Sequence, residues 1–209
     1  ITSNLSFSND LTQLFESSYY RVKISSLSPY TCGPRYSESI YVEVYDPLSA
    51  GELSEHPNLC FNNAPDSIYF QVPPSGEDGE YQYSWAYKTE DSNWGTLDHY
   101  LPIYYPEDLV ETTYFSVLVT SPLCQTSSLT DSTTQVIYPI LEAGTISSDD
   151  VICYNEVPNL LENESPPTGG DGTYTYQWFE STNNITDWTS SNISTLEYQP
   201  ENLFESTQY

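Results

Sequence analysis

The chain has 209 residues with 4 basic and 30 acidic side chains, which give a formal net charge of −26 at pH 7. This charge excludes nucleic acid as a partner, because binding needs a basic surface that displaces phosphate counterions, and it disfavours an anionic membrane surface. The 20 Tyr, 7 Phe and 4 Trp are too many aromatic residues for a disordered acidic tail. No apolar run approaches the roughly 20 residues of a membrane-spanning helix, so we expect a folded acidic protein without membrane insertion.

The first part of the chain predicts two strands, at residues 19–24 and 39–45. In the first strand Tyr20, Val22 and Ile24 alternate with Arg21 and Lys23, which is the period of a half-buried strand. The second strand ends before Asp46-Pro47, and a residue that precedes proline favours an extended or turn conformation. We expect a junction there.

The middle of the chain predicts a series of short strands separated by turns. Turn residues recur roughly every 8–12 positions, which is the spacing of sandwich folds, and we find no helical periodicity. The predicted strands cover residues 52–59, 67–72, 81–87, 100–105, 113–119 and 133–138. We expect Trp94, which follows a polar loop, and its counterpart Trp188 to be buried.

One stretch of this region recurs later in the chain. Residues 76–85, Gly-Glu-Asp-Gly-Glu-Tyr-Gln-Tyr-Ser-Trp, return as residues 169–178, Gly-Gly-Asp-Gly-Thr-Tyr-Thr-Tyr-Gln-Trp, so the offset from Gly76 to Gly169 is 93 residues. Gly and Asp favour a chain reversal, and the alternating Tyr81, Tyr83 and Trp85 form one aromatic face of a strand. A row of this kind needs a second sheet to cover it.

The same offset organises the rest of the chain into units. Residues 14–20 also match residues 109–115 and 203–209 in the spacing Leu-x-x-x-Thr/Ser-x-aromatic. We therefore predict the C-terminal part of one repeat at 1–46, a complete repeat at 47–139 and the N-terminal part of another at 140–209. A period of 93 residues suits an immunoglobulin-like (Ig-like) domain, so we expect tandem Ig-like antiparallel β-sandwich domains in a rod-like all-β array.

These features together resemble the Ig/PKD-like repeats of giant Bacteroidetes cell-surface proteins, of which SprB-type gliding-motility adhesins are the best-known members. The resemblance rests on Ile152-Cys153, the 167–181 stretch, Trp188, Tyr198 and the motif at 203–209, and it covers essentially the whole chain. It implies export by type IX secretion and an extracellular, cell-surface location. The expected function is a stalk or spacer segment of an adhesin filament involved in attachment and gliding.

Cysteine occurs twice per predicted repeat. We expect a disulfide between Cys60 and Cys124, because it lies within one unit and would close a long loop in an oxidising setting. An objection is that these positions lie at opposite ends of a standard sandwich. Pairing across the junctions, Cys32 with Cys60 and Cys124 with Cys153, and free thiols are the alternatives.

Neither a metal site nor a catalytic site is predicted. Asp78 and Asp171 are weak candidates for calcium, but no spacing matches a known cation loop, and ordinary turn acids explain them better. His56 and His99 align with Asp149 and Ile193, so no base recurs between repeats. We expect no cofactor and no enzyme.

A binding module is the rival function. Tyr100, Tyr104 and Tyr105 lie in a less repeated stretch and are the candidate binding aromatics, because Tyr is common in interfaces and sugar sites. The expected partners are neighbouring repeats, with extracellular polysaccharide, a substratum, or cell-surface motility and secretion machinery as further candidates. A binding module predicts exposed aromatic residues at equivalent sites of successive repeats, whereas a spacer predicts exposed Thr, Ser, Asp and Glu.

Overall fold

The computed structural model describes residues 14–25, 33–147, 149–182 and 186–209. The regular structure of these residues is entirely β, with strands β1 to β18 and no helix. A helix that could span a membrane is accordingly not found in the described part. Every strand pair is antiparallel except β6 with β14. The prediction of an all-β, predominantly antiparallel chain is confirmed.

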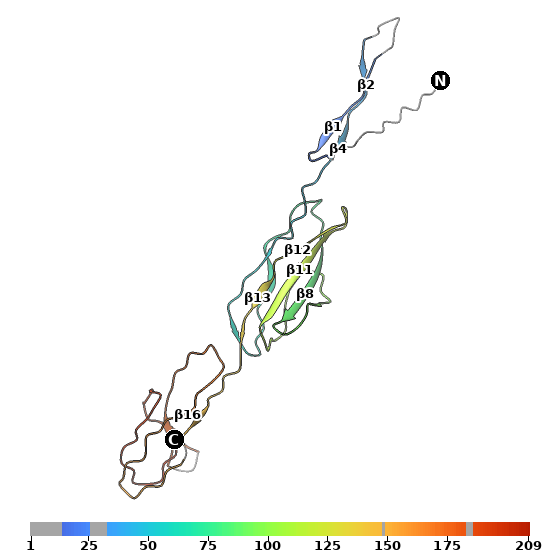
Figure 1. The fold of residues 1–209 in the computed structure, drawn as a ribbon. Coiled ribbons are helices and arrows are strands. Elements are labelled where there is room, and N and C mark those ends of the chain that lie inside the picture. Colours follow the sequence, from blue (N-terminus) through green and yellow to red (C-terminus); the bar gives the residue numbers. More distant parts are fainter. Residues whose placement is uncertain (1–13, 26–32, 148, 183–185) are drawn as a thin grey trace.

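The N-terminal part forms two small two-stranded sheets. Figure 1 shows them beyond one end of the central sheets. The single strand predicted at 19–24 is divided, because its two halves pair with different partners and the Val22 amide instead binds the Ser37 hydroxyl at 2.9 Å. The strands are β1 (Ser18–Tyr20) with β4 (Ile40–Val42), and β2 (Lys23–Ile24) with β3 (Arg35–Tyr36).

The largest sheet surrounds strand β11. Its sequence, TYFSVLVTS, is rich in the β-branched and aromatic residues that favour buried strands, and it pairs with β8, β12 and β13. On β8 the predicted alternation is confirmed, since Tyr81, Tyr83 and Trp85 turn inward while Gln82 and Ser84 are exposed. The strands are β8 (Gln82–Thr89), β9 (Gly95–Thr96), β11 (Thr113–Ser121), β12 (Thr126–Leu129) and β13 (Thr133–Gln135).

A three-stranded sheet shares one apolar core with the large sheet. Leu53 and Ile68 of the smaller sheet join Trp85, Phe115 and Val117 of the larger one in a single buried cluster. Burial of such side chains away from water is the main driving force for folding. The strands of the smaller sheet are β5 (Glu52–Leu53), β7 (Ile68–Val72) and β10 (Ile103–Tyr104).

The remaining strands are short pairs. Parallel strands β6 and β14 lie within the central region, and the C-terminal region has two antiparallel pairs. They are β6 (Leu59–Cys60) with β14 (Ile137–Tyr138), β15 (Thr145–Ile146) with β16 (Asn163–Ser165), and β17 (Phe179–Glu180) with β18 (Thr189–Ser190). Trp178 keeps its inward position at 8 % exposure, as its counterpart Trp85 does.

The Leu-x-x-x-Thr/Ser-x-aromatic motif forms the same local turn three times. The Thr113 hydroxyl donates to the Glu111 carbonyl at 2.9 Å. The equivalent bonds are Thr207 to Glu205 at 3.2 Å and Ser18 to Glu16 at 3.2 Å. A short hydroxyl side chain that bonds backbone two residues away stabilises a turn, which explains why the motif needs Ser or Thr at this position.

The prediction that Trp94 and Trp188 are buried is wrong. Their side chains are 47 % and 40 % exposed. Trp94 lies beside Lys88, whose Nζ is 5.7 Å from the ring centroid, a distance at which a cation is attracted by the ring face. The indole therefore lies at the surface beside the Lys88 ammonium group and does not fill the core.

Candidate functional site

The most specific repeated geometry lies where a Gly-containing turn holds the peptide that enters a repeat. The Glu77 amide donates to the Asp46 carbonyl at 2.8 Å, and the Tyr81 hydroxyl donates to the Gly76 carbonyl at 2.7 Å. Gly76 has φ 91°, and a Cβ there would overlap the Pro47 carbonyl. Only glycine meets both conditions, a positive φ and backbone contact.

The same geometry recurs 93 residues later. The Gly170 amide donates to the Pro139 carbonyl at 2.9 Å, and the Tyr174 hydroxyl donates to the Gly169 carbonyl at 2.8 Å. Gly169 has φ 76°, and its Cβ would overlap the Ile140 carbonyl. The repeated Gly and Tyr of the sequence therefore have one structural role in both copies.

A short antiparallel bridge completes each copy. Ser49 and Ser75 exchange backbone hydrogen bonds of 2.8 and 3.0 Å, and Glu142 and Thr168 exchange bonds of 2.9 and 3.0 Å. We call residues 46–49 with 75–81, and residues 139–142 with 168–174, the junction clamps. Each clamp ties the start of a predicted repeat to a turn about 30 residues further along the chain by main-chain bonds.

The two candidate cation ligands are turn residues within these clamps. The Asp78 carboxylate accepts a hydrogen bond from the Glu80 amide at 3.3 Å, and Asp171 accepts one from the Thr173 amide at 2.9 Å. This is the side-chain-to-backbone bond by which Asp stabilises a turn. In the described residues, no group of three or more acids, His or Cys is placed to hold a metal ion.

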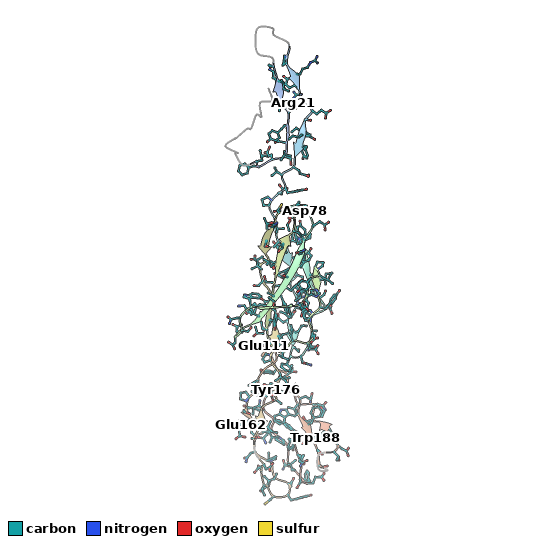
Figure 2. The ribbon with its side chains drawn as sticks, turned by 90° about the vertical axis from the view of Figure 1, so that its right-hand side faces the viewer. Arg21, Asp78, Glu111, Glu162, Tyr176 and Trp188 are labelled. Carbon is teal, nitrogen blue, oxygen red and sulfur yellow. The ribbon has the colours of Figure 1, made fainter. Side chains whose placement is uncertain are left out.

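The predicted Cys60–Cys124 disulfide does not form in this structure. Both cysteines are free and exposed. Cys60 pairs with Tyr138 near the start of β11, whereas Cys124 lies in the turn beyond its other end. The nine residues of β11 span about 26 Å, far above the Cα separation of about 7 Å that a disulfide permits. Figure 2 shows Asp78, whose charge acts on Cys124, and Glu111 at opposite ends of the central region. The Asn62 amide, two residues after Cys60, donates to the carbonyl of Leu109, two residues before Glu111.

Of the two alternative pairings across the junctions, that of Cys124 with Cys153 is not formed either, because Cys153 is also free and exposed. The other pairing, of Cys32 with Cys60, involves Cys32, which lies outside the described residues.

The structure separates the three candidate binding aromatics. Tyr100 and Tyr105 are 65 % and 67 % exposed. Tyr104 instead packs in the core, with its ring centroid 5.6 Å from that of Trp85 and 5.8 Å from that of Phe115. Burial raises the pKa of the Tyr104 phenol. Tyr104 is therefore a core residue, and only two exposed tyrosines remain in this patch.

A Ser–His pair that the sequence did not indicate occurs at the start of the central region. The Ser54 hydroxyl and His56 Nε2 are 2.7 Å apart, and burial lowers the pKa of His56. A nucleophile must reach its substrate, but Ser54 is 2 % exposed and also accepts a hydrogen bond from the Tyr69 amide at 3.2 Å. The pair therefore has a structural role in satisfying buried polar groups.

A family described as a domain of unknown function (DUF8696) matches residues 142–209. No curated protein matches the chain.

Proposed function

We propose that the chain is a non-catalytic stalk or spacer segment of a large cell-surface adhesin filament. In this proposal the segment consists of tandem Ig-like β-sandwich repeats and takes part in surface attachment and gliding motility. It catalyses no reaction, and its role is to keep the parts of the filament on either side of it at a fixed separation under tension. The observation that carries the proposal is the pair of junction clamps, which recur with the same bonds at the repeat period.

The clamps suit a load-bearing array for a geometric reason. A junction of free residues would let neighbouring repeats swing, because flexible linkers behave as random coils. Here the entering peptide is bound on both sides, through Ser49 and through Asp46, to a turn of the repeat that follows. The clamp therefore holds residues 46–49 against the repeat that follows and shortens the part of the junction that can move freely.

The surface chemistry also favours a spacer over a binding module. The net charge of −26 makes neighbouring filaments repel one another and keeps them soluble. The exposed Tyr100 and Tyr105 have Ser194 and Gln199 at the corresponding positions of the next repeat. A ligand-binding face would need the aromatic residues in successive repeats, so this patch does not follow the pattern expected of a repeated binding site.

Pulling a single molecule of the whole chain between two handle proteins tests the mechanical role. The predicted complete repeat, 47–139, should unfold in one cooperative event that lengthens the chain by about 30 nm, given roughly 3.3–3.6 Å per extended residue. Gradual lengthening at low force, without this event, would contradict a load-bearing spacer.

A glycan array probed with the whole chain tests the rival function. We expect no saturable binding. Binding that is lost in a Tyr100→Ser, Tyr105→Ser double variant would favour a glycan- or polymer-binding module. An in-frame deletion of the repeats in the producing cell should shorten the surface filament, and filaments of unchanged length would argue against the stalk.

A further inference from the structure

Ser54, which directly follows β5, connects the two sheets of the central region. Its amide donates to the Tyr69 carbonyl at 2.8 Å, and its hydroxyl accepts a hydrogen bond from the Tyr69 amide at 3.2 Å. The Ser54 carbonyl accepts a hydrogen bond from the Thr133 hydroxyl at 2.7 Å. Tyr69 belongs to β7 of the smaller sheet and Thr133 to β13 of the larger one, so one residue holds both sheets.

The hydroxyl proton of Ser54 determines the protonation state of its neighbour His56. Ser54 is 2 % exposed, so this proton is shielded from water and needs an acceptor in the protein. Among the described residues, His56 Nε2 is the acceptor within reach, 2.7 Å from the Ser54 Oγ. An imidazole nitrogen accepts only when it carries no proton. The pair therefore requires a neutral His56 with its proton on Nδ1.

His99, the second of the two histidines of the chain, has the opposite requirement. Its Nε2 lies 2.6 Å from the Ile103 carbonyl oxygen. Because a carbonyl can only accept, Nε2 of His99 is the donor and carries a proton in both the neutral and the cationic ring. A proton added to His99 at Nδ1 leaves this hydrogen bond intact, whereas a proton added to His56 at Nε2 removes the acceptor of a buried hydroxyl.

The surroundings of His56 disfavour its charged form. Burial lowers the pKa of His56 from its ordinary value of 6.5, and the opposite effect of the Asp66 carboxylate is smaller. Tyr69 packs edge-on against the imidazole, with 6.5 Å between the ring centroids, and Glu55, the neighbour of His56 in the chain, is exposed. The unfolded chain therefore binds the proton first. The stability that depends on neutral His56 is present above pH 6.5 and is lost as the pH falls from 6.5 towards the lower pKa of the folded chain.

The serine contacts recur in the next repeat, but the histidine does not. The Ser147 amide donates to the Glu162 carbonyl at 2.8 Å, and the Ser147 hydroxyl accepts a hydrogen bond from the Glu162 amide at 3.4 Å. These are the contacts that Ser54 makes with β7. By repeat alignment, Asp149 stands at the position of His56. The serine therefore belongs to the repeat pattern, whereas a response to acid in the range of histidine is a property added to the central repeat.

We propose that the Ser54–His56 pair is an acid-sensitive contact that loosens the central repeat in mildly acidic solution. At neutral pH the imidazole accepts the Ser54 proton. In acid, Nε2 takes a proton from the solvent, the buried hydroxyl loses its acceptor, and residues 54–56 separate more readily from β7 and β13. Only hydrogen bonds change in this step. The contact does not depend on the proposed spacer function, since it requires only these residues of the central repeat.

NMR of the 15N-labelled whole chain tests the two protonation states. Correlations between the ring protons and the ring nitrogens distinguish a protonated nitrogen from a bare one, and His56→Gln and His99→Gln assign the signals. At pH 7.5 we expect a bare Nε2 on His56 and a protonated Nε2 on His99. A protonated Nε2 on His56 at this pH would overturn the proposal.

Amide hydrogen exchange of the whole chain at pH 7.5 and pH 5.5 tests the consequence for the repeat. Histidine is the side chain that ordinarily changes its charge in this range. The Val117 amide, which donates to the buried Thr130 hydroxyl at 2.9 Å, lies in the core and exchanges when the repeat opens. We expect its protection factor, which corrects for the intrinsic effect of pH on exchange, to fall about fivefold at the lower pH, the effect of losing one ordinary hydrogen bond.

The two histidine variants decide whether His56 causes this fall. In His56→Gln the amide oxygen can accept the Ser54 proton at both pH values, so the protection factor of Val117 should be the same at both. His99→Gln is the matched control and should retain the full fall. An equal fall in His56→Gln and in the unchanged chain, or no fall in the unchanged chain, would show that the pair does not respond to acid.

Discussion

The Tyr81 hydroxyl donates a hydrogen bond to the Gly76 carbonyl at 2.7 Å, and so connects the core to the junction. The Tyr81 ring packs against the apolar cluster between the two sheets. Gly76 lies in the turn that contacts Pro47. One side chain therefore couples the packing of a repeat to the peptide that enters it. The Tyr174 hydroxyl donates the equivalent hydrogen bond to the Gly169 carbonyl at 2.8 Å.

Loss of this hydroxyl should weaken the central repeat. We expect Tyr81→Phe to lower the free energy of unfolding by about 0.5–1.5 kcal/mol, the usual net contribution of one hydrogen bond. Urea denaturation followed by tryptophan fluorescence measures it. Tyr105→Phe is the matched control, because that ring is 67 % exposed, and it should have no effect. Equal stability of Tyr81→Phe and the unchanged chain would show that the turn does not need the bond.

Two glycines of the same turn separate backbone strain from steric overlap. Gly76 and Gly79 have φ 91° and 80°, so alanine is strained at either position. A Cβ at Gly79 meets nothing within 4 Å, whereas a Cβ at Gly76 overlaps Pro47. We expect Gly76→Ala to destabilise the chain by about 1–3 kcal/mol more than Gly79→Ala, the usual effect of overpacking. Similar midpoints in urea for the two variants would contradict the clamp.

The sequence predicts the elements whose pattern is local. The alternation of Tyr81, Tyr83 and Trp85 indicated the buried face of β8 correctly, because burial has a period of two along a strand. Strand β12 was not predicted. The turn before it has Gln125 at φ 57°, a conformation that usually signals Gly, Asn or Asp, so the sequence carried no turn signal there.

Contacts between distant segments were harder to predict. The repeat of Gly76 at position 169 can be read from the sequence. The contact between Gly76 and Pro47 cannot, because it depends on how the chain folds back over about 30 residues. The disulfide prediction failed because the length of the closed loop was given more weight than the objection that Cys60 and Cys124 lie at opposite ends of a standard sandwich.

Two serines of β11 should respond oppositely to alanine. Ser121 is fully buried, and its hydroxyl has no hydrogen-bond partner among the described residues. An unsatisfied buried polar group is destabilising, so Ser121→Ala should raise the free energy of unfolding by about 1 kcal/mol. Ser116 donates to the Thr130 carbonyl at 3.2 Å, and Ser116→Ala should lower it. Destabilisation by Ser121→Ala would indicate a partner such as a bound water.

The Glu77 carboxylate should slow the reaction of the Cys124 thiol with thiol reagents. A hydrogen bond to that carboxylate is the main cause that raises the pKa of Cys124, and the thiolate is the reactive form. In a chain that keeps only Cys124, Glu77→Gln should speed the reaction with Ellman's reagent at pH 7.5. In a chain that keeps only Cys60, which lies at the other end of β11, the same substitution should leave the rate unchanged. Equal rates for Cys124 with and without this substitution would show that the carboxylate does not act on the thiol.

Tyr209 should make the C-terminal region sensitive to alkali. Burial is the main cause that raises the pKa of its phenol to about 12, from the ordinary value of 10.0. The neutral phenol is therefore favoured in the folded state. Its contribution to stability should be complete below pH 10 and be lost as the pH rises from 10 towards 12, because the unfolded chain ionises first.

NMR of the chain with 13C-labelled tyrosine rings measures this titration, and the resonance missing from Tyr209→Phe identifies the phenol. We expect a midpoint near 12 in the folded chain and about 10 in urea. A midpoint near 10 in both conditions would mean that Tyr209 is fully solvated and that residues 203–209 do not pack as in the structure. Tyr198, whose ring centroid is 5.7 Å from that of Tyr209, should shift its resonance as Tyr209 ionises.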